Sequence, residues 1–370
     1  MKKEKKKPEW QRILSTAFAI LASMATGVAL AWGNFRFAID SLPKLLFLLG
    51  ALYVAMVFHV IIHEAGHLVF GLLTGYKFCS FRIFSFMWLQ EEGKLKLKRH
   101  SLAGTGGQCL MAPPDMTEGS FPVFWYNMGG SILNLLTSAL LLLGFLLAQN
   151  IPNLAHLLLI FSVLGFLLGI LNGVPLRMGA VDNDGYNAIA LVKNPLALEA
   201  LWLQLKIAEQ SAKGVRLKDM PEAWFIVPSD EDMKNSLVSA RGVFVCNRLM
   251  DAGKFAEAEQ LMAKLLSIES GMPELYRQIL ACDRLFLELV GENRQDVIAA
   301  MQTKDLQKFR KAMKHYPGVL RTEYALALRH DRDVVKAQKC LEEFEKIAKT
   351  YPYPQEIEAE RELIEVADNA

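Results

Sequence analysis

The stretch His-Glu-Ala-Gly-His at residues 63–67, which lies in the apolar run 45–69, decides how the rest of the chain is interpreted. On a helix, residues i and i+4 share one face, so His63 and His67 can bind one metal ion together. Glu64 follows directly and is placed to act as a general base. The pattern predicts a zinc site of a metallohydrolase. The competing interpretation, a pair of core histidines, leaves two imidazoles and a carboxylate in hydrocarbon, which is unfavourable unless they pair or bind metal.

The composition divides the 370-residue chain into two parts. Hydrophobic residues make up 52% of the whole, and their surplus lies in the first half, whereas the sequence beyond about residue 195 is ordinary and charged. The formal net charge of +2 argues against a nucleic-acid partner. The 5 cysteines are scattered without a C-x-x-C pair, which favours reduced structural thiols.

Long uncharged stretches predict a membrane protein with about four transmembrane helices. Residues 13–35 contain no Asp, Glu, Lys or Arg, and residues 119–176 are equally free of them. Each predicted segment is long enough to cross a bilayer of about 30 Å. A signal peptide that is cleaved after the Ala-Leu-Ala sequence at 29–31 is the alternative for the first segment. Together with the metal helix, the expected spans are 13–35, 45–70, 122–148 and 154–176.

The distribution of lysine and arginine predicts the orientation in the membrane. Residues 1–44 combine a basic N-terminus with the first span, and basic residues are also in excess in the loop 76–118. Both are expected on the cytoplasmic side. With four spans the C-terminus is also cytoplasmic, and we expect a multi-pass protein of the bacterial cytoplasmic membrane. The basic residues of the loop are Lys77, Arg82, Lys94, Lys96, Lys98 and Arg99.

The loop after the metal helix predicts a β-hairpin. Residues 77–89 are apolar and aromatic on both faces, and residues 94–98 alternate strictly after a Glu-Gly turn at 92–93. The aromatic run 78–88 is expected either to form an ordinary core strand or to hold an unwound substrate segment by strand addition. The glycine-rich residues 104–107 lack the ending of a phosphate loop and receive no chemical role.

Residues 195–370 predict a cytoplasmic α-helical domain. Residues 249–258 resemble the turn and second helix of a tetratricopeptide repeat, and a plain helical bundle is the alternative. This domain is expected to recruit a cytosolic protein partner. The predicted fold class is therefore mainly α: a polytopic membrane core with a cytoplasmic β-hairpin insertion, followed by a repeat-like helical domain.

A catalytic zinc site needs a third protein ligand besides the two histidines. The candidates are Asp184, Asp182, His59 and His100. His59 lies one turn before the first histidine, on the wrong side of the pair unless the helix deforms. We favour Asp184, because it precedes a glycine that permits a tight turn and lies at the same membrane face as the histidines. Asp182 remains its rival.

Three motifs, in order, resemble the site-2 protease family of intramembrane zinc metalloproteases. The first is the H-E-x-x-H helix at 63–67, and the second is a G-x-x-x-N element from Gly130 to Asn134. The third is an N-x-x-P element at 172–175 followed by Asp-Gly at 184–185. The resemblance covers residues 45–190.

The resemblance implies His63, His67 and Asp184 as zinc ligands, Glu64 as the catalytic base, and Asn172 near the substrate or the oxyanion. Two departures are visible. The aspartate follows the proline at a greater distance than is usual, and serine follows Gly130 where many members have proline. No PDZ-like or CBS-like domain is evident, and the helical domain takes that place.

The sequence therefore predicts an intramembrane zinc metalloendopeptidase. Its substrates would be membrane-spanning, membrane-tethered or signal-peptide-like segments in the lipid bilayer, cleaved near the cytoplasmic face. The first alternative is a non-catalytic membrane protein of the same fold that binds a partner through residues 195–370. A transporter fits poorly, because no second-half repeat of the four spans is visible.

Overall fold

The computed structural model describes residues 16–18, 20–21, 23–24, 26–28, 41–91, 93–100, 106–178 and 181–370. The chain is mainly helical and contains a small antiparallel sheet. It divides into two compact units, and each is described by itself. The first unit comprises Met1–Phe84 and Gly104–Pro195, and the second comprises Ser85–Ala103 and Leu196–Ala370.

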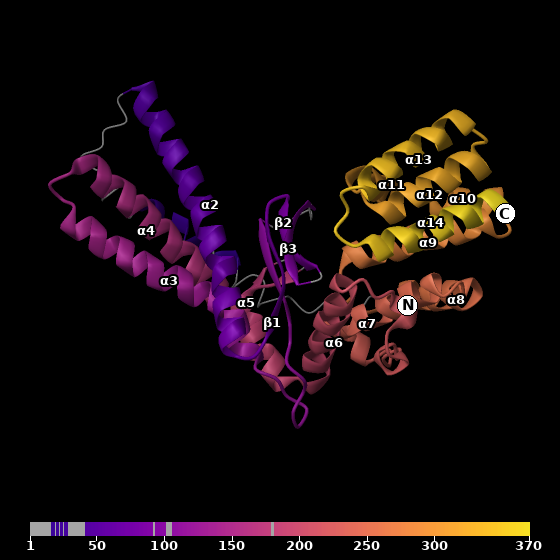
Figure 1. The fold of residues 1–370 in the computed structure, drawn as a ribbon, viewed down its shortest axis with the longest axis horizontal. Coiled ribbons are helices and arrows are strands. Elements are labelled where there is room, and N and C mark those ends of the chain that lie inside the picture. Colours follow the sequence, from indigo (N-terminus) through magenta and orange to yellow (C-terminus); the bar gives the residue numbers. More distant parts are fainter. Residues whose placement is uncertain are drawn as a thin grey trace, which may run out of the picture. The chain divides into compact units, whose positions relative to one another are not determined.

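Three long apolar helices form the body of the first unit: α2 (Leu42–Leu73), α3 (Val123–Leu147) and α4 (Pro152–Gly173). Within the described residues, these are the helices long and apolar enough to cross a membrane. Helices α3 and α4 pack side by side, and α2 packs against both (Figure 1). Prolines in the first turns of α2 and α4 suit helix starts, because those positions need no hydrogen-bond donor.

The three helices correspond to three of the four expected spans. The remaining expected span, 13–35, falls mostly outside the described residues, since only 16–18, 20–21, 23–24 and 26–28 are described there, as helix. A fourth span, the possible cleavage near residues 29–31 and the orientation in the membrane therefore stay predictions.

The loop between α2 and α3 contains four strands rather than one hairpin. They are β1 (Lys77–Ile83) and β4 (Gly107–Ala112) in the first unit, and β2 (Phe86–Glu91) and β3 (Lys94–Arg99) in the second. The expected hairpin is present as the antiparallel pair β2 and β3. The apolar run 77–89 is divided into two strands because Phe84 has a left-handed φ of 51°. Strand β4, which pairs with β1, was not predicted.

Short elements follow α4 and lead to the end of the first unit. Strands β5 (Arg177–Met178) and β6 (Val181–Asp182) form a small antiparallel pair. Helix α5 (Asp184–Ala190) follows at once and packs against α3 and α4. The Asp-Gly sequence thus begins a helix that lies against two of the long apolar helices.

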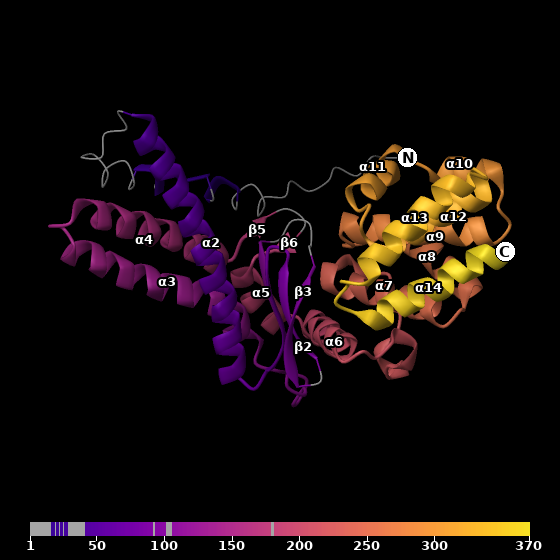
Figure 2. The same cartoon turned by 45° about the horizontal axis from the view of Figure 1, so that its top comes forward.

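Apart from β2 and β3, the second unit consists of helices (Figure 2). Most of them are joined by short loops, whereas a longer segment with 3-10 turns, residues 213–235, joins α6 to α7. Helix α12 lies at the centre of the unit and packs against α9, α13 and α14. Residues 249–258 do form the end of one helix, a turn and the start of the next, but a tetratricopeptide-like repeat is not established by this junction. The helices are α6 (Pro195–Ala212), α7 (Ser236–Asp251), α8 (Phe255–Ser267), α9 (Glu274–Val290), α10 (Gln295–Met301), α11 (Lys304–Ala312), α12 (Pro317–Ala325), α13 (Val334–Ala348) and α14 (Pro354–Asn369).

Candidate metal centre

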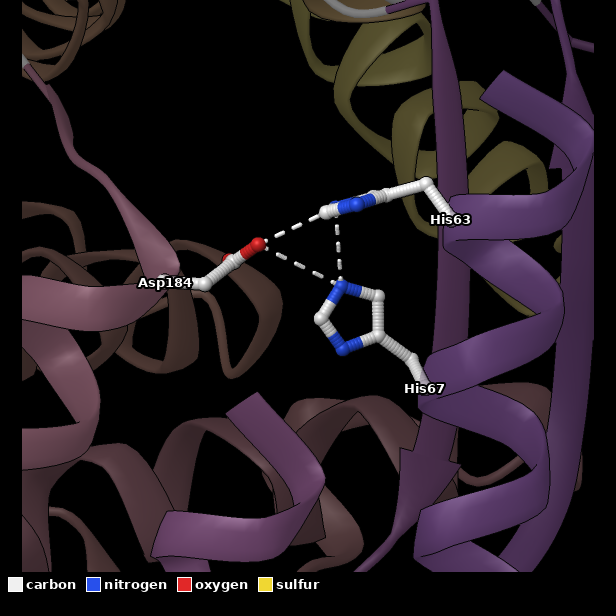
Figure 3. Close-up of side chains that lie close together, drawn as sticks. All are labelled: His63, His67 and Asp184. Carbon is white, nitrogen blue, oxygen red and sulfur yellow. Dashed lines mark hydrogen bonds and ion pairs between the residues drawn. The ribbon is translucent and has the colours of Figure 1, made fainter. Parts of the chain in front are cut away.

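Three side chains from two elements converge on one point in the first unit (Figure 3). His63 and His67 lie one turn apart on α2, and Asp184 is the first residue of α5. The ligand atoms of all three lie within 4.8 Å of one another, so the group could hold a metal ion. The Asp184 carboxylate oxygen Oδ2 lies 3.0 Å from His63 Nε2 and 3.5 Å from His67 Nε2.

These distances fit a small tetrahedral ion. Two ligands held at about 2.0–2.1 Å from a tetrahedral centre lie about 3.3 Å apart. The two Nε2 atoms are separated by 3.1 Å, and each lies 3.0 or 3.5 Å from the carboxylate oxygen. Two imidazole nitrogens and one carboxylate oxygen are also a ligand set that catalytic zinc sites use. The residues therefore fit zinc in both donor chemistry and spacing.

A hydrogen bond fixes the ring of His67. Its Nδ1 lies 2.7 Å from the backbone carbonyl oxygen of Tyr126, which can only accept, so Nδ1 carries the proton and donates. The Nε2 atom of the same ring faces Asp184 and His63, and it binds a metal ion through its lone pair when it carries no proton. Histidine ligands in metalloproteins are commonly oriented by such a bond from the other ring nitrogen.

The Asp184 carboxylate is held ionised by its neighbours. Burial raises the pKa of Asp184, but hydrogen bonds and charge interactions with His63 and His67 outweigh it and lower the pKa well below its usual range. An ionised carboxylate is the form that binds a metal ion.

Glycines make room for the ligands where α2 meets α3. A Cβ atom on Gly130 would lie 2.5 Å from Cε1 of His63, closer than real Cβ atoms approach a neighbour. At Gly66 and Gly129, each Cβ would meet the other residue's carbonyl oxygen, at 2.3 and 2.5 Å. The two backbones therefore touch at this level, and the His63 ring occupies the space that a side chain at 130 would need.

The side chain of Asn183 positions Asp184. Its Oδ1 accepts from the backbone N–H groups of Leu176 (3.0 Å) and Tyr186 (2.9 Å). Its Nδ2 donates to the carbonyl oxygens of Leu171 and Val174, both at 2.6 Å. One amide thus caps α5 and ties its start to the end of α4.

Glu64 lies between the metal group and strand β4. Its carboxylate interacts electrostatically with the group and with the backbone at Cys109. A Cβ atom on Gly107 would lie 2.6 Å from Cγ of Glu64. The strand can therefore approach the glutamate this closely only because residue 107 is glycine.

The other candidate ligands lie elsewhere. His59 is fully buried, with Nδ1 3.1 Å from Oδ1 of Asn134 and Nε2 2.7 Å from the carbonyl oxygen of Phe161. His100 belongs to the second unit, where its ring meets that of Tyr351 edge-on. The side chain of Asp182 lies outside the described residues. Among the candidates whose side chains the structure describes, Asp184 is the one that joins the two histidines.

Asn172 was predicted to lie near the substrate or the oxyanion, and its hydrogen bond in the structure does not test this role. Its Nδ2 donates to the carbonyl oxygen of Leu168 in its own helix, at 3.1 Å. Its place near a substrate or oxyanion stays a prediction implied by the family resemblance.

Sequence reasoning missed Gly107, Asn183 and the carbonyl of Tyr126. Signals existed for two of them. An Asn directly before Asp-Gly is a common helix start, and the glycine pair at 106–107 indicated a close approach of the backbone. No sequence signal identifies a backbone carbonyl as a partner.

Comparisons of the chain with protein-family models, with curated proteins and with solved structures found no match.

Proposed function

We propose that the protein is an intramembrane zinc metalloendopeptidase. The observation that carries the proposal is the convergence of His63, His67 and Asp184, with Glu64 beside them. A structural zinc site would use four protein ligands and would need no adjacent base, whereas three ligands and a neighbouring glutamate are typical of hydrolytic sites.

The residues of the chain have separate roles in this proposal. When bound, Zn²⁺ would supply Lewis acidity that polarises the scissile carbonyl and makes water more acidic. His63, His67 and Asp184 would hold the ion. Glu64 would take the proton from the attacking water and deliver it to the leaving amine, as a general base and then a general acid.

The position of the group along α2 indicates where cleavage would occur. His63 is 21 residues beyond the start of the helix at Leu42, which is about 32 Å along its axis. This distance matches the thickness of the hydrocarbon core, so the group lies close to one membrane face. The basic loop that follows favours the cytoplasm for this side. Substrates would be transmembrane or membrane-tethered segments that unwind locally there.

The test is cleavage of a panel of single-span membrane peptides by purified protein, with bound zinc quantified. We expect the wild type to bind about one equivalent of zinc and to cleave. Glu64→Gln should retain zinc, and its cleavage rate should fall by at least about 100-fold, because general base catalysis contributes on that order. Asp184→Asn should lose both. Asp182→Asn is the matched control and should retain both.

Two results would contradict the proposal or its ligand assignment. If folded wild-type protein with bound zinc cleaves no peptide of the panel and none of a co-expressed library, the non-catalytic alternative replaces it. If Asp182→Asn loses zinc and Asp184→Asn keeps it, the ligand assignment is wrong.

A further inference from the structure

The second unit contains a cavity of about 330 Å³ among helices α6, α7, α9, α11, α12 and α14. Sites for small ligands typically range from about 300 to 1,000 Å³. The cavity is therefore large enough for one amino-acid side chain or a small organic molecule. Its walls are largely apolar and aromatic and include Phe244, Tyr276, Phe309, Tyr316 and Tyr351.

The charged groups of the cavity are unbalanced in favour of carboxylates. On one side, Arg216 is shared between Asp251 and Glu362. On the other, Arg321 is buried and is shared between Asp283 and Glu360. Both arginines are thus occupied, each by two carboxylates.

Glu356 is the further carboxylate that lines the cavity. It accepts a hydrogen bond from the Tyr351 hydroxyl at 3.0 Å, and among the described residues no cation forms an ion pair with it. Burial raises the pKa of Glu356 to about 7, and the neighbouring Glu360 adds to this. A half-buried carboxylate without a cation is unfavourable, and a positively charged ligand would relieve it.

Gln355 gives a second, independent indication. Its side chain lines the cavity and is 6% exposed. The amide nitrogen donates to the carbonyl oxygen of Ser211 at 2.5 Å, which fixes the amide. The amide oxygen Oε1 accepts no hydrogen bond from any residue that the structure describes. A buried carbonyl oxygen of this kind normally has a partner.

We propose that this cavity binds an organic cation, an ammonium or guanidinium group on an apolar stem, through Glu356 and Gln355. The carboxylate supplies the charge, the amide oxygen accepts a second N–H, and the aromatic walls cover the stem. Aromatic faces also attract cations. The inference concerns the second unit alone and does not depend on the metal centre or on proteolysis.

Two sources offer this chemistry: a basic residue of a peptide, or a free alkylamine. The test measures binding to the full-length protein in detergent by calorimetry at pH 8, where Glu356 is largely ionised. The probes are N-acetyl-lysine amide, N-acetyl-arginine amide and cadaverine. N-acetyl-norleucine amide, which has the same stem without the charge, is the control ligand.

We expect at least one cationic probe to bind and the norleucine compound to bind at least tenfold more weakly. Glu356→Gln should weaken binding of the cation at least tenfold, while Tyr351 can still donate to the new amide. Gln355→Met should weaken it by a smaller factor. Glu358→Gln, an exposed change on the same helix, should leave binding unaltered.

The preferred probe identifies the source. Binding of the lysine or arginine amide but not of cadaverine indicates a peptide, and the reverse indicates a free amine. The proposal is overturned if no cationic probe binds at 10 mM, on the order of the weakest useful affinity. Equal binding of the norleucine compound, or unchanged binding by a folded Glu356→Gln variant, overturns it as well.

Discussion

At the scale of single residues, the candidate metal centre depends on the absence of a side chain at Gly130. We predict that Gly130→Ala lowers the affinity for zinc by about 10-fold to 100-fold, the range typical of residues that orient metal ligands. The reason is that its Cβ would lie 2.5 Å from the His63 ring, which must then move. Zinc content after dialysis against graded chelator concentrations measures the effect.

The matched control is Gly144→Ala on the same helix. There a Cβ would lie 3.4 Å from Cδ1 of Leu158, which is ordinary van der Waals contact. We expect wild-type zinc affinity for this variant. If the two alanine variants bind zinc equally well, the His63 ring does not need the space at residue 130.

A substitution at Gly107 would test the role of Glu64 as a base separately from metal binding. We predict that Gly107→Ala lowers the rate of peptide cleavage by about 10-fold or more while zinc is retained, because the new Cβ would displace Glu64 and not the histidines. The neighbouring Gly106→Ala is the control, since its Cβ would lie 3.8 Å from the nearest side chain, that of Val60. Loss of zinc in Gly107→Ala, or equal rates in the two variants, would contradict this role of β4.

At the scale of elements, the junction between α4 and α5 sets the position of Asp184. We predict that Asn183→Ala destabilises this junction by about 1–2 kcal/mol, because a helix cap is lost and buried backbone groups at Leu171 and Leu176 lose their partners. Zinc affinity should fall with it. Asn183→Asp should also destabilise the junction and lower the zinc affinity, since a carboxylate cannot donate to the carbonyl oxygens of Leu171 and Val174.

Equilibrium dialysis with zinc, together with resistance to limited proteolysis between residues 171 and 186, measures the change. Asn150→Ala, at an exposed turn between α3 and α4, is the control. If Asn183→Ala binds zinc as the wild type does, α5 is held by its packing on α3 and α4 and the amide is dispensable.

The elements also show what the sequence could and could not predict. The apolar runs and the i, i+4 histidines located α2, α3 and α4, because membrane spans and helical ligand pairs are local patterns. Strand β4 was missed, since the pairing of residues 107–112 with β1 is a contact across more than 20 residues. The division at Phe84 was missed because a left-handed aromatic residue is exceptional.

The residues of the candidate site also differ in how far the sequence could predict them. His63, His67 and Glu64 could be predicted, because their spacing places them within about one turn of a single helix. Asp184 could be preferred over Asp182 from its glycine neighbour, but only the folded chain brings its carboxylate to within 3.0 Å of His63. The residues that hold these side chains in place, such as Asn183, act through contacts with distant backbone groups, which no local pattern encodes.

At the scale of the whole molecule, the number of spans determines on which side of the membrane each terminus lies. Helices α2, α3 and α4 are three candidate spans, so the start of α2 and the end of α4 face opposite sides if all three cross. A crossing by residues 13–35 would return the N-terminus to the side of the C-terminus. The basic residues in the loop after α2 favour the cytoplasm for that side.

We therefore predict that a fluorescent protein fused after Ala370 is fluorescent in a bacterial host and that alkaline phosphatase fused there is inactive. The same two reporters ahead of Met1 should give the same pair of results, because an even number of crossings separates the two positions.

An active phosphatase at the C-terminus would reverse the orientation and would move the metal group to the outer face, since His63 and His67 lie at the end of α2 that adjoins the loop. A cytoplasmic C-terminus with an external N-terminus would instead keep the cytoplasmic metal site and show that residues 13–35 do not cross. The pair of fusions thus tests the orientation and the fourth span independently, and the location of the proposed cleavage depends on the first result alone.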